Sequence, residues 1–584
     1  MIINYLAKYK MKFNLRFFVQ QIVLFCLLST VNAQHDGKRW GDLGNGRYRN
    51  QILPADYSDP EVLRMGKDYY LISSTFQFSG GIVIMHSRDL VNWKTIGSVV
   101  KDLPNELKDN RFDWSVMDHY DKGVYAASLR YHEKKFWCYF TTYNKGGIYV
   151  ATAKKITGTW EVKQMKDKNG VPLFGLNWDD NCPLWDDNGK AYMVTSNPGE
   201  NWFPILFQMS WDGTQLLDGD INKMKIKTKD QTDRGTNILP NATWGEGNKI
   251  FKKDGYYYIY HNQCFLPNYD RRATIARSKN IYGTKPDGTP GKPGDAGMYD
   301  ISPQGTQSYL MVHPDSTGGR FDQGTIIDTP DGKKWYFLTH QGEGYQNGRP
   351  ISLLPVTWVD GWPMAGVDYD NDKVAEPVWE NEKPVQGQKK TFPQGSDEFN
   401  CKKLNPQWMW NYQPRDEKWS LSNRKGFLRL YAFKPLIEST FFKAGNTICQ
   451  RYVKSETTKA EIKMDISAMT VGQEAGLSHF NGGSNYCTLS VKMTEKGKII
   501  KYNDNGKVTE GDAISAPIIW LRSVVNNNGI NQYFYSIDGK SFIKFGADYK
   551  LRWGGFRGDN IGIFNYNNLS ESGYVDVDWF HYSF

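Results

Sequence analysis

Three acidic side chains precede aromatic strands at similar distances along the chain. Asp59, Asp180 and Glu246 lie ten, twelve and eleven residues before a strand tyrosine. A single acid near a turn usually caps that turn, but three at matched offsets favour a common site. Carboxyl groups crowded in a poorly hydrated pocket cannot all ionise, so their pKa values spread. One can then act as a base and another as an acid, the division of labour that hydrolysis of a glycosidic bond requires.

Aromatic residues lie close to these acids in the sequence. Phe76, Trp114 and Trp178 offer apolar ring faces of the kind that pack on sugar rings. Core packing is the alternative role for each of them. The combination of acids and aromatic faces predicts a carbohydrate as the substrate.

The acids are positioned by a strand pattern that repeats five times. Each repeat has two β-rich runs separated by a polar or glycine-containing turn, which is a hairpin signal. The runs are MGKDYYLIS (65–73), HEKKFWCYF (132–140), DNGKAYMV (187–194), KDGYYYIY (253–260) and PDGKKWYFL (330–338). Five similar four-stranded units predict a five-bladed β-propeller over residues 34–381, with an ordinary β-sandwich as the alternative. The strand before each hairpin is then innermost, which brings the three acids to one end of the central axis.

A second domain follows a polar stretch rich in Pro and Gly at 382–399, which has the composition of a linker. Beyond it, residues 400–584 alternate like strands, and 530–545 forms a hairpin around Asp538-Gly539. This pattern predicts a C-terminal β-sandwich, so the fold class is all-β throughout. A carbohydrate-binding module and a structural brace are both open as its role.

The N-terminus has the features of a signal peptide over residues 1–33. Four basic residues precede the apolar run 22–31, and Ala33 ends a plausible cleavage site. The run is too short to span a bilayer as a helix, so we expect no transmembrane span and export to the periplasm or the extracellular space. A surface lipoprotein modified at Cys26 is the less favoured alternative. Without this segment the net charge falls from +9 to +5, with no basic block that would indicate nucleic-acid binding.

Several motifs together resemble glycoside hydrolase family 43. They are YSDP, HSRDLVNW, CPLWDDNGKAY, EGNKIFKKDGYYY and GRPISLLPVTWVDGWP, in this order. The resemblance covers nearly all of the chain after residue 33, and its C-terminal part resembles the concanavalin-A-like, jelly-roll domain of the β-xylosidase branch. That domain packs on the propeller and can contribute a loop to the rim of the pocket.

The family resemblance implies an inverting exo-glycosidase that releases terminal xylose or arabinofuranose from oligosaccharide or polysaccharide fragments. It implies that Asp59 is the general base, Glu246 the general acid and Asp180 the residue that tunes the acid, with Asp179 as the alternative to Asp180. Arg349 is then the arginine that contacts substrate hydroxyls. Inversion requires the base and acid carboxyls to stand about 6.5–9.5 Å apart, which leaves room for the attacking water.

The chain also departs from the family pattern. Many members carry a His on the inner strand of blade five, linked to a central calcium or water cluster, whereas this chain has Asp322 and Gln323. We therefore expect no required cofactor and no metal ligand, and a structural calcium is left open. A non-catalytic sugar-binding propeller and a retaining fructan-type hydrolase are the alternative functions.

Overall fold

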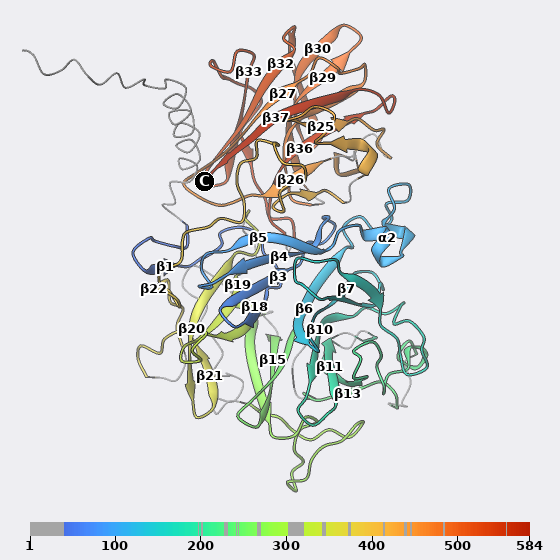
Figure 1. The fold of residues 1–584 in the computed structure, drawn as a ribbon, viewed down its shortest axis with the longest axis vertical. Helices are drawn as coiled ribbons and strands as arrows, with labels where there is room; N and C mark the ends of the chain where they lie inside the picture. The colour runs from blue at the N-terminus through green and yellow to red at the C-terminus, as the bar shows by residue number, and fades with distance from the viewer. Residues whose placement is uncertain are drawn as a thin grey trace, which may run out of the picture.

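The computed structural model describes residues 40–584 with short gaps (Figure 1). The residues left out are 197, 200–201, 227–231, 241, 243–244, 266–269, 302–320, 342–345, 372–374, 413–414, 437–440, 444–446, 483–484 and 556, and the side chains of 265 and 270–272. The predicted signal peptide, 1–33, lies outside the described residues. No helix in the described part of the chain is long and apolar enough to cross a membrane.

Five four-stranded antiparallel sheets follow one another along the first part of the chain. Blade one consists of β2 (Glu61–Met65), β3 (Asp68–Ser73), β4 (Gly81–Ser87) and β5 (Lys94–Val100). Blade two consists of β6 (Val124–His132), β7 (Lys135–Thr142), β8 (Ile148–Ala153) and β9 (Glu161–Gln164). Blade three consists of β10 (Asp179–Trp185), β11 (Ala191–Ser196), β12 (Ile205–Met209) and β13 (Thr236–Asn237). Blade four consists of β14 (Gly245–Lys253), β15 (Tyr256–Phe265), β16 (Asp270–Ser278) and β17 (Asp300–Ile301). Blade five consists of β18 (Phe321–Asp328), β19 (Trp335–Gln341), β20 (Ile351–Val359) and β21 (Trp362–Ala365).

The first strand of every blade lies against the axis. β2 contacts β6, β6 contacts β10, β10 contacts β14, β14 contacts β18, and β18 contacts β2 again, so the inner strands form a closed ring. Each is joined to the second strand of its blade by the tight turn that the sequence predicted, because Gly and polar residues supply the required backbone angles. The predicted five-bladed propeller is confirmed.

Two larger sheets pack face to face in the C-terminal domain, which lies above the propeller in Figure 1. The seven-stranded sheet contains β23 (Met409–Trp410), β26 (Ile448–Arg451), β36 (Asn560–Asn567), β28 (Gln473–Phe480), β29 (Tyr486–Thr494), β30 (Gly497–Asp504) and β31 (Lys507–Ile514). The eight-stranded sheet contains β24 (Trp419–Ser420), β25 (Leu428–Tyr431), β37 (Tyr574–Ser583), β27 (Thr457–Asp465), β32 (Ile518–Asn526), β33 (Ile530–Ser536), β34 (Ile543–Lys544) and β35 (Tyr549–Lys550). The predicted sandwich is confirmed.

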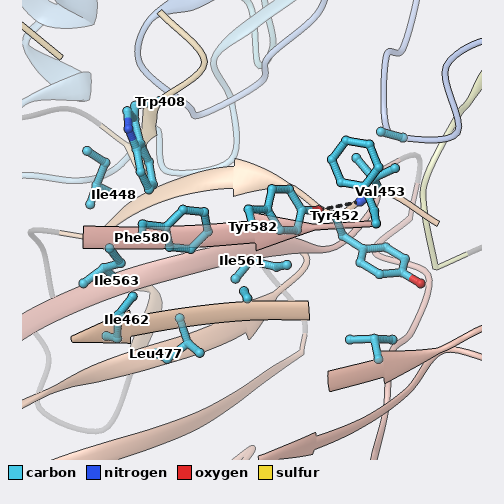
Figure 2. Close-up of a cluster of buried hydrophobic side chains, with 14 of the residues drawn as sticks. Trp408, Ile448, Tyr452, Val453, Ile462, Leu477, Ile561, Ile563, Phe580 and Tyr582 are labelled. Atoms are coloured by element: carbon cyan, nitrogen blue, oxygen red, sulfur yellow. Dashed lines mark hydrogen bonds between the residues drawn. The ribbon is translucent and has the colours of Figure 1, made fainter. Parts of the chain in front are cut away.

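The core of the sandwich is built from the inward-facing residues of both sheets. Ile462 and Phe580 from one sheet and Leu477 and Ile563 from the other are fully buried and pack together (Figure 2). Burying one such side chain stabilises the fold by about 1.5–3 kcal/mol. The same apolar cluster continues into blade one of the propeller, so the two domains share a core.

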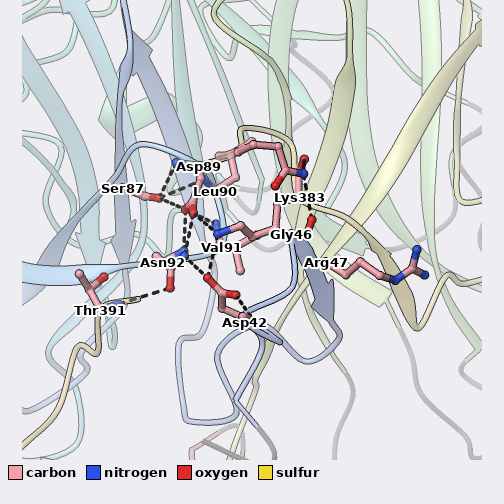
Figure 3. Close-up of polar contacts among 12 residues, drawn as sticks. Asp42, Gly46, Arg47, Ser87, Asp89, Leu90, Val91, Asn92, Lys383 and Thr391 are labelled. Carbon is pink, nitrogen blue, oxygen red and sulfur yellow. Dashed lines mark hydrogen bonds and ion pairs between the residues drawn. The ribbon is translucent and has the colours of Figure 1, made fainter. Parts of the chain in front are cut away.

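The stretch 382–399 is packed against the propeller over much of its length. Lys383 Nζ lies 2.8 Å from Asp42 Oδ2 and 3.3 Å from Asp89 Oδ2, and the Thr391 amide donates to Asn92 Oδ1 (Figure 3). The Lys383 side chain is only 5% exposed. Residues 382–399, which have the composition of a linker, therefore form an extended segment held against blade one.

Few other elements occur in the described residues. They are β1 (Arg47–Arg49), which pairs with β22 (Glu380–Glu382), the helices α2 (Leu103–Leu107) and α3 (Ile221–Met224), and the 3-10 turns η1 (Asn110–Phe112), η2 (Asp416–Lys418) and η3 (Phe441–Lys443). A further bridge joins Leu53 to Ile351 of β20. These pairings tie the start of the propeller to its end.

Candidate active site

The predicted acids lie where the inner strands begin, next to irregular backbone. Bulges interrupt β10 and β14 near their first residues. Asp59 and Asp180 both have positive φ angles, 53° and 50°, and the corresponding residue of β14 is Gly247, with φ of 80°. Glu246 therefore lies one position earlier than the matched offsets suggested, in the place that Asp179 takes in blade three. The bulges turn successive side chains toward the same end of the axis.

Asp59 is held in one orientation by three neighbours. Its Oδ1 accepts a hydrogen bond from Arg349 Nη1 at 3.0 Å, and its Oδ2 accepts one from Ser74 Oγ at 2.6 Å. Its backbone amide donates to His340 Nδ1 at 2.9 Å. The carboxylate is 7% exposed and the Arg349 side chain 9%, so the predicted base and the predicted substrate-binding arginine lie in direct contact.

Asp179, Asp180, Glu246 and Asp59 form what we call the acid cluster. Burial and the negative charges of Asp180 and Glu246 raise the pKa of Asp179 well above its ordinary value. Burial and Glu246 raise the pKa of Asp180 to about 8, although Lys249 and a hydrogen bond from the Gly247 amide act in the opposite direction. Crowded, buried carboxyls do not all ionise easily, and this crowding is the physical cause of the raised pKa values of Asp179 and Asp180.

Asp180 and Asp179 differ in their contacts. Asp180 is fully buried, and its Oδ2 accepts from the amide of Gly247 at 2.6 Å, immediately beside Glu246. Asp179 is partly exposed, and its Oδ1 accepts from the amide of Asp180 at 3.1 Å. Of the two, Asp180 is the one bonded directly to the backbone that carries Glu246.

The three predicted aromatic residues lie in different surroundings. The Phe76 ring is 5.0 Å from Tyr125, whose strand β6 begins beside the acids, and Phe76 is 2% exposed. Trp178 packs on Phe207 in the apolar cluster of blades two and three. Trp114 packs edge-on against Tyr412 and Phe433 of the C-terminal domain. Contact of these rings with a sugar stays a prediction.

A histidine does reach the acids, but from an unexpected strand. His340 lies near the end of β19, the second strand of blade five, and is 1% exposed. Because its Nδ1 accepts from the Asp59 amide, its proton is on Nε2, which lies 3.7 Å from Asp322 Oδ2. Sequence reasoning missed His340 because it considered only inner-strand positions; the His in FLTHQ, just past a predicted hairpin, was the available signal.

The axis immediately behind the acids is filled by Glu61, Arg130 and Lys249, which we call the axial ion cluster. Lys249 Nζ lies 2.8 Å from Glu61 Oε2 and 3.3 Å from Ser128 Oγ, and Arg130 pairs with the other Glu61 oxygen. Burial opposes ionisation of Glu61, but the two cations outweigh it and hold its pKa below its ordinary value.

The axial ion cluster does not suit a calcium ion. Calcium takes six to eight oxygen ligands, whereas this position already has two cations around a single carboxylate. Within the described residues, no group of three or more His, Cys, Asp or Glu side chains is arranged to hold a metal.

Comparison with known proteins agrees with this architecture. Residues 48–363 match the family model of glycosyl hydrolases family 43, and residues 396–583 match the β-xylosidase C-terminal concanavalin A-like domain. A β-xylosidase of Formosa agariphila is 34% identical, over 93% of this chain and 92% of its own. A non-reducing end α-L-arabinofuranosidase of Bacteroides ovatus is 26% identical, over 74% of each chain.

The fold also has solved counterparts. The GH43 protein BlXynB of Bacillus licheniformis superposes with a TM-score of 0.72 at 24% identity, covering 92% of this chain and 99% of its own. The matches to the family models and to the named relatives do not favour the non-catalytic propeller or the fructan-type hydrolase. The chain belongs to glycosyl hydrolases family 43 and is a glycoside hydrolase.

Proposed function

We propose that the protein is an exo-acting, inverting glycosidase that releases terminal xylose or arabinofuranose from fragments of plant polysaccharide. The observation that carries the proposal is the acid cluster, in which Asp59 is bonded to Arg349 while Asp180 is buried and bonded to the Gly247 amide beside Glu246. The named activities of its relatives, β-xylosidase and α-L-arabinofuranosidase, support the choice of sugar.

In the proposed mechanism Asp59 removes a proton from a water molecule, which attacks the anomeric carbon. Arg349 donates to Oδ1 of Asp59 and Ser74 donates to Oδ2, and together these bonds fix the orientation of the carboxylate. Glu246 protonates the departing oxygen on the opposite side of the sugar, and Asp180 positions Glu246 through its hydrogen bond from the adjacent Gly247 amide. Such acid–base assistance is worth about 10²–10⁴-fold in rate.

Two measurements test the proposal. Turnover of an aryl β-xyloside and an aryl α-L-arabinofuranoside, compared at equal enzyme concentration, decides which sugar is preferred. The anomeric configuration of the first product, followed by NMR, decides between inversion and retention. Absence of turnover on both glycosides, or a product of retained configuration, would refute the corresponding part of the proposal.

We also propose that the protein is exported, with cleavage after Ala33. The basic residues and the apolar run of 1–33 support this placement. N-terminal sequencing of the protein recovered from the periplasm or the medium tests it. A protein that keeps residues 1–33 in the cytoplasm would contradict export, and a lipid on Cys26 would favour a surface lipoprotein.

A further inference from the structure

The C-terminal sandwich reaches the catalytic end of the propeller through residues 557–559, which we call the docking segment. Arg557 Nη1 donates to Gln77 Oε1 at 3.0 Å, and Arg557 also pairs with Asp121. Its guanidinium lies 5.6 Å from the centre of the Phe76 ring, within the range of a cation–π contact. Arg557 is only 7% exposed, so it forms part of the packed wall around Phe76.

The other two residues of the docking segment contact the chain next to Asp59 and Arg349. The Asp559 amide donates to the Gln346 carbonyl at 2.9 Å. The Asp56 carboxylate accepts hydrogen bonds from the backbone amides of Arg349 and Gly558. A displacement of the docking segment therefore acts on the backbone on both sides of the Asp59–Arg349 pair.

The backbones meet at two glycines with no spare room. A Cβ at Gly558 would lie 2.6 Å from the Gly348 nitrogen, and a Cβ at Gly348 would lie 2.6 Å from the Gly558 nitrogen. Real Cβ atoms are not found so close to backbone atoms. A shift of the Gly558 backbone would therefore shift the Gly348 backbone, because no flexible side chain lies between the two.

The docking segment is itself fixed by a buried polar network in the sandwich. Asp559 Oδ1 lies 2.5 Å from His479 Nδ1, and His479 Nε2 lies 2.7 Å from Ser523 Oγ. His479 is on β28 of one sheet and Ser523 on β32 of the other, so the network crosses the core. All three residues are at most 1% exposed, and in such a low-dielectric interior an unpaired polar group is costly.

The order Asp–His–Ser is that of a hydrolytic triad, but this serine cannot act as a nucleophile. Ser523 is fully buried, and its hydroxyl donates to Asn531 Oδ1 at 2.7 Å. A substrate cannot approach it without opening the core between the sheets. The network is therefore suited to fixing the position of Asp559 rather than to catalysis.

We propose that His479 is a positioning residue for the glycosidase site. Through Asp559 it fixes the docking segment, which in turn holds Phe76 and the backbone beside Asp59 and Arg349. This inference rests on the proposed function of that site. In this proposal the sandwich helps to shape the pocket, and His479 affects the reaction without contacting the sugar.

Two variants of His479 separate positioning from general stability. The side-chain amide nitrogen of Asn at this position lies close to the position of His479 Nδ1, so it keeps the contact with Asp559. The longer side chain of Gln places its amide nitrogen close to the position of Nε2, so it keeps the contact with Ser523. His479→Gln should thus release Asp559 and lower kcat/KM by up to about 100-fold, as small misplacements of catalytic groups can. His479→Asn should keep most of the wild-type kcat/KM, even if both variants melt at the same lower temperature.

Gln473→Met is the matched control. Gln473 is a fully buried polar residue of β28 that bonds Asn565 at 2.9 Å. Gln473→Met should lower Tm without lowering kcat/KM. If His479→Gln does not fold, Arg557→Met is used in its place, and Arg557→Lys is the variant that conserves the charge. KM should rise more in Arg557→Met than in Arg557→Lys.

The assays use the full chain and an aryl glycoside, at a temperature where every variant is folded. Loss in His479→Gln but not in His479→Asn or Gln473→Met supports the inference. Equal activity in His479→Gln and wild type, equal losses in both His479 variants, or an unchanged KM in Arg557→Met overturns it. If the wild-type protein turns over neither glycoside, the proposed function fails and the inference fails with it. If the wild-type protein is active but His479→Gln is equally active, only the inference fails.

Discussion

The acid cluster and the axial ion cluster both lie along the inner ring of the propeller but have opposite charge balance. Glu61 follows Asp59 by two residues, and Lys249 follows Glu246 by three. The axial ion cluster surrounds one carboxylate with two cations, and the pKa of Glu61 is lowered. The acid cluster gathers four carboxylates near one bonded guanidinium, and the pKa of Asp180 is raised.

The difference shows how one ring of strands supports both stability and chemistry. The axial ion cluster satisfies its charges with partners, which favours the folded state once the groups are buried. The acid cluster brings carboxyl groups together in a buried place, which costs stability and raises the pKa of Asp179 and Asp180. Substitutions in the two clusters should accordingly have opposite effects on stability, and only those in the acid cluster should remove the chemistry.

Asp59→Asn should have the largest effect on activity. The amide cannot accept a proton from water, so we expect about a 10²–10⁴-fold loss of kcat on every substrate. Isosteric replacement keeps the contact with Ser74 within reach, so the fold should remain intact. The measurement is kcat on an aryl glycoside and on an unactivated disaccharide, with circular dichroism as the control for folding. Near-normal kcat on the disaccharide would exclude Asp59 as the base.

Glu246→Ala should lose activity in a manner that depends on the leaving group. An activated aryl group departs with little protonation, whereas a sugar alkoxide needs the full assistance of about 10²–10⁴-fold. We therefore expect a large loss of kcat on xylo- or arabino-oligosaccharides and a much smaller one on the aryl glycoside. Asp59→Ala is the matched comparison and should reduce both alike. Equal losses for Glu246→Ala on the two substrates would exclude Glu246 as the acid.

Glu61→Gln should destabilise the fold by about 3–5 kcal/mol, because it leaves Lys249 and Arg130 buried without their carboxylate. The folded-state pKa of Glu61 is lowered, so its contribution is present above the ordinary value of 4.5 and is lost as the pH falls through the folded pKa. Denaturant unfolding at pH 7 and at acidic pH measures both effects.

Glu380→Gln is the control for Glu61→Gln. Its pair with Arg49 is more than two-fifths exposed on both sides, and such surface pairs contribute about 0–1 kcal/mol. Similar losses in the two variants would mean that the axial ion cluster contributes no more than a surface pair.

Asp180→Asn should stabilise the protein, the opposite sign to Glu61→Gln. The folded-state pKa of Asp180 is raised from 3.8 to about 8, so the wild-type protein loses stability as the pH rises between these values. Asn stays neutral, so the gain should grow from pH 4 to pH 8 and reach at least about 1.4 kcal/mol, the equivalent of one pKa unit. Unfolding curves across this range test it; a gain that is absent or independent of pH would contradict the raised pKa.

Local patterns were sufficient to predict the fold but only part of the site. Hairpins depend on neighbouring residues, so the turns and the alternation of β-rich runs located the blades and the sandwich. Asp59 and His340 are 281 residues apart, and Glu61 and Lys249 are 188 apart. Such pairs depend on how the blades close into a ring, which no local pattern encodes. Trp114 packs on Tyr412, and its contact with a sugar stays a prediction, because an indole ring suits either role.

Removal of metal ions should have the smallest effect of all. A calcium ion on the axis would supply positive charge near the acids, and here Lys249 and Arg130 already supply it, with Lys249 acting to lower the pKa of Asp180. We therefore expect kcat and KM to be unchanged after treatment with a chelator and removal of the chelated metal. Lys249→Met sharpens the test, since it removes the built-in charge and should raise the pKa of Asp180 further, shifting the pH–rate profile upward. A large loss on chelation in the wild-type protein, restored by calcium and not by magnesium, would show that a bound cation and not the ammonium balances the acid cluster.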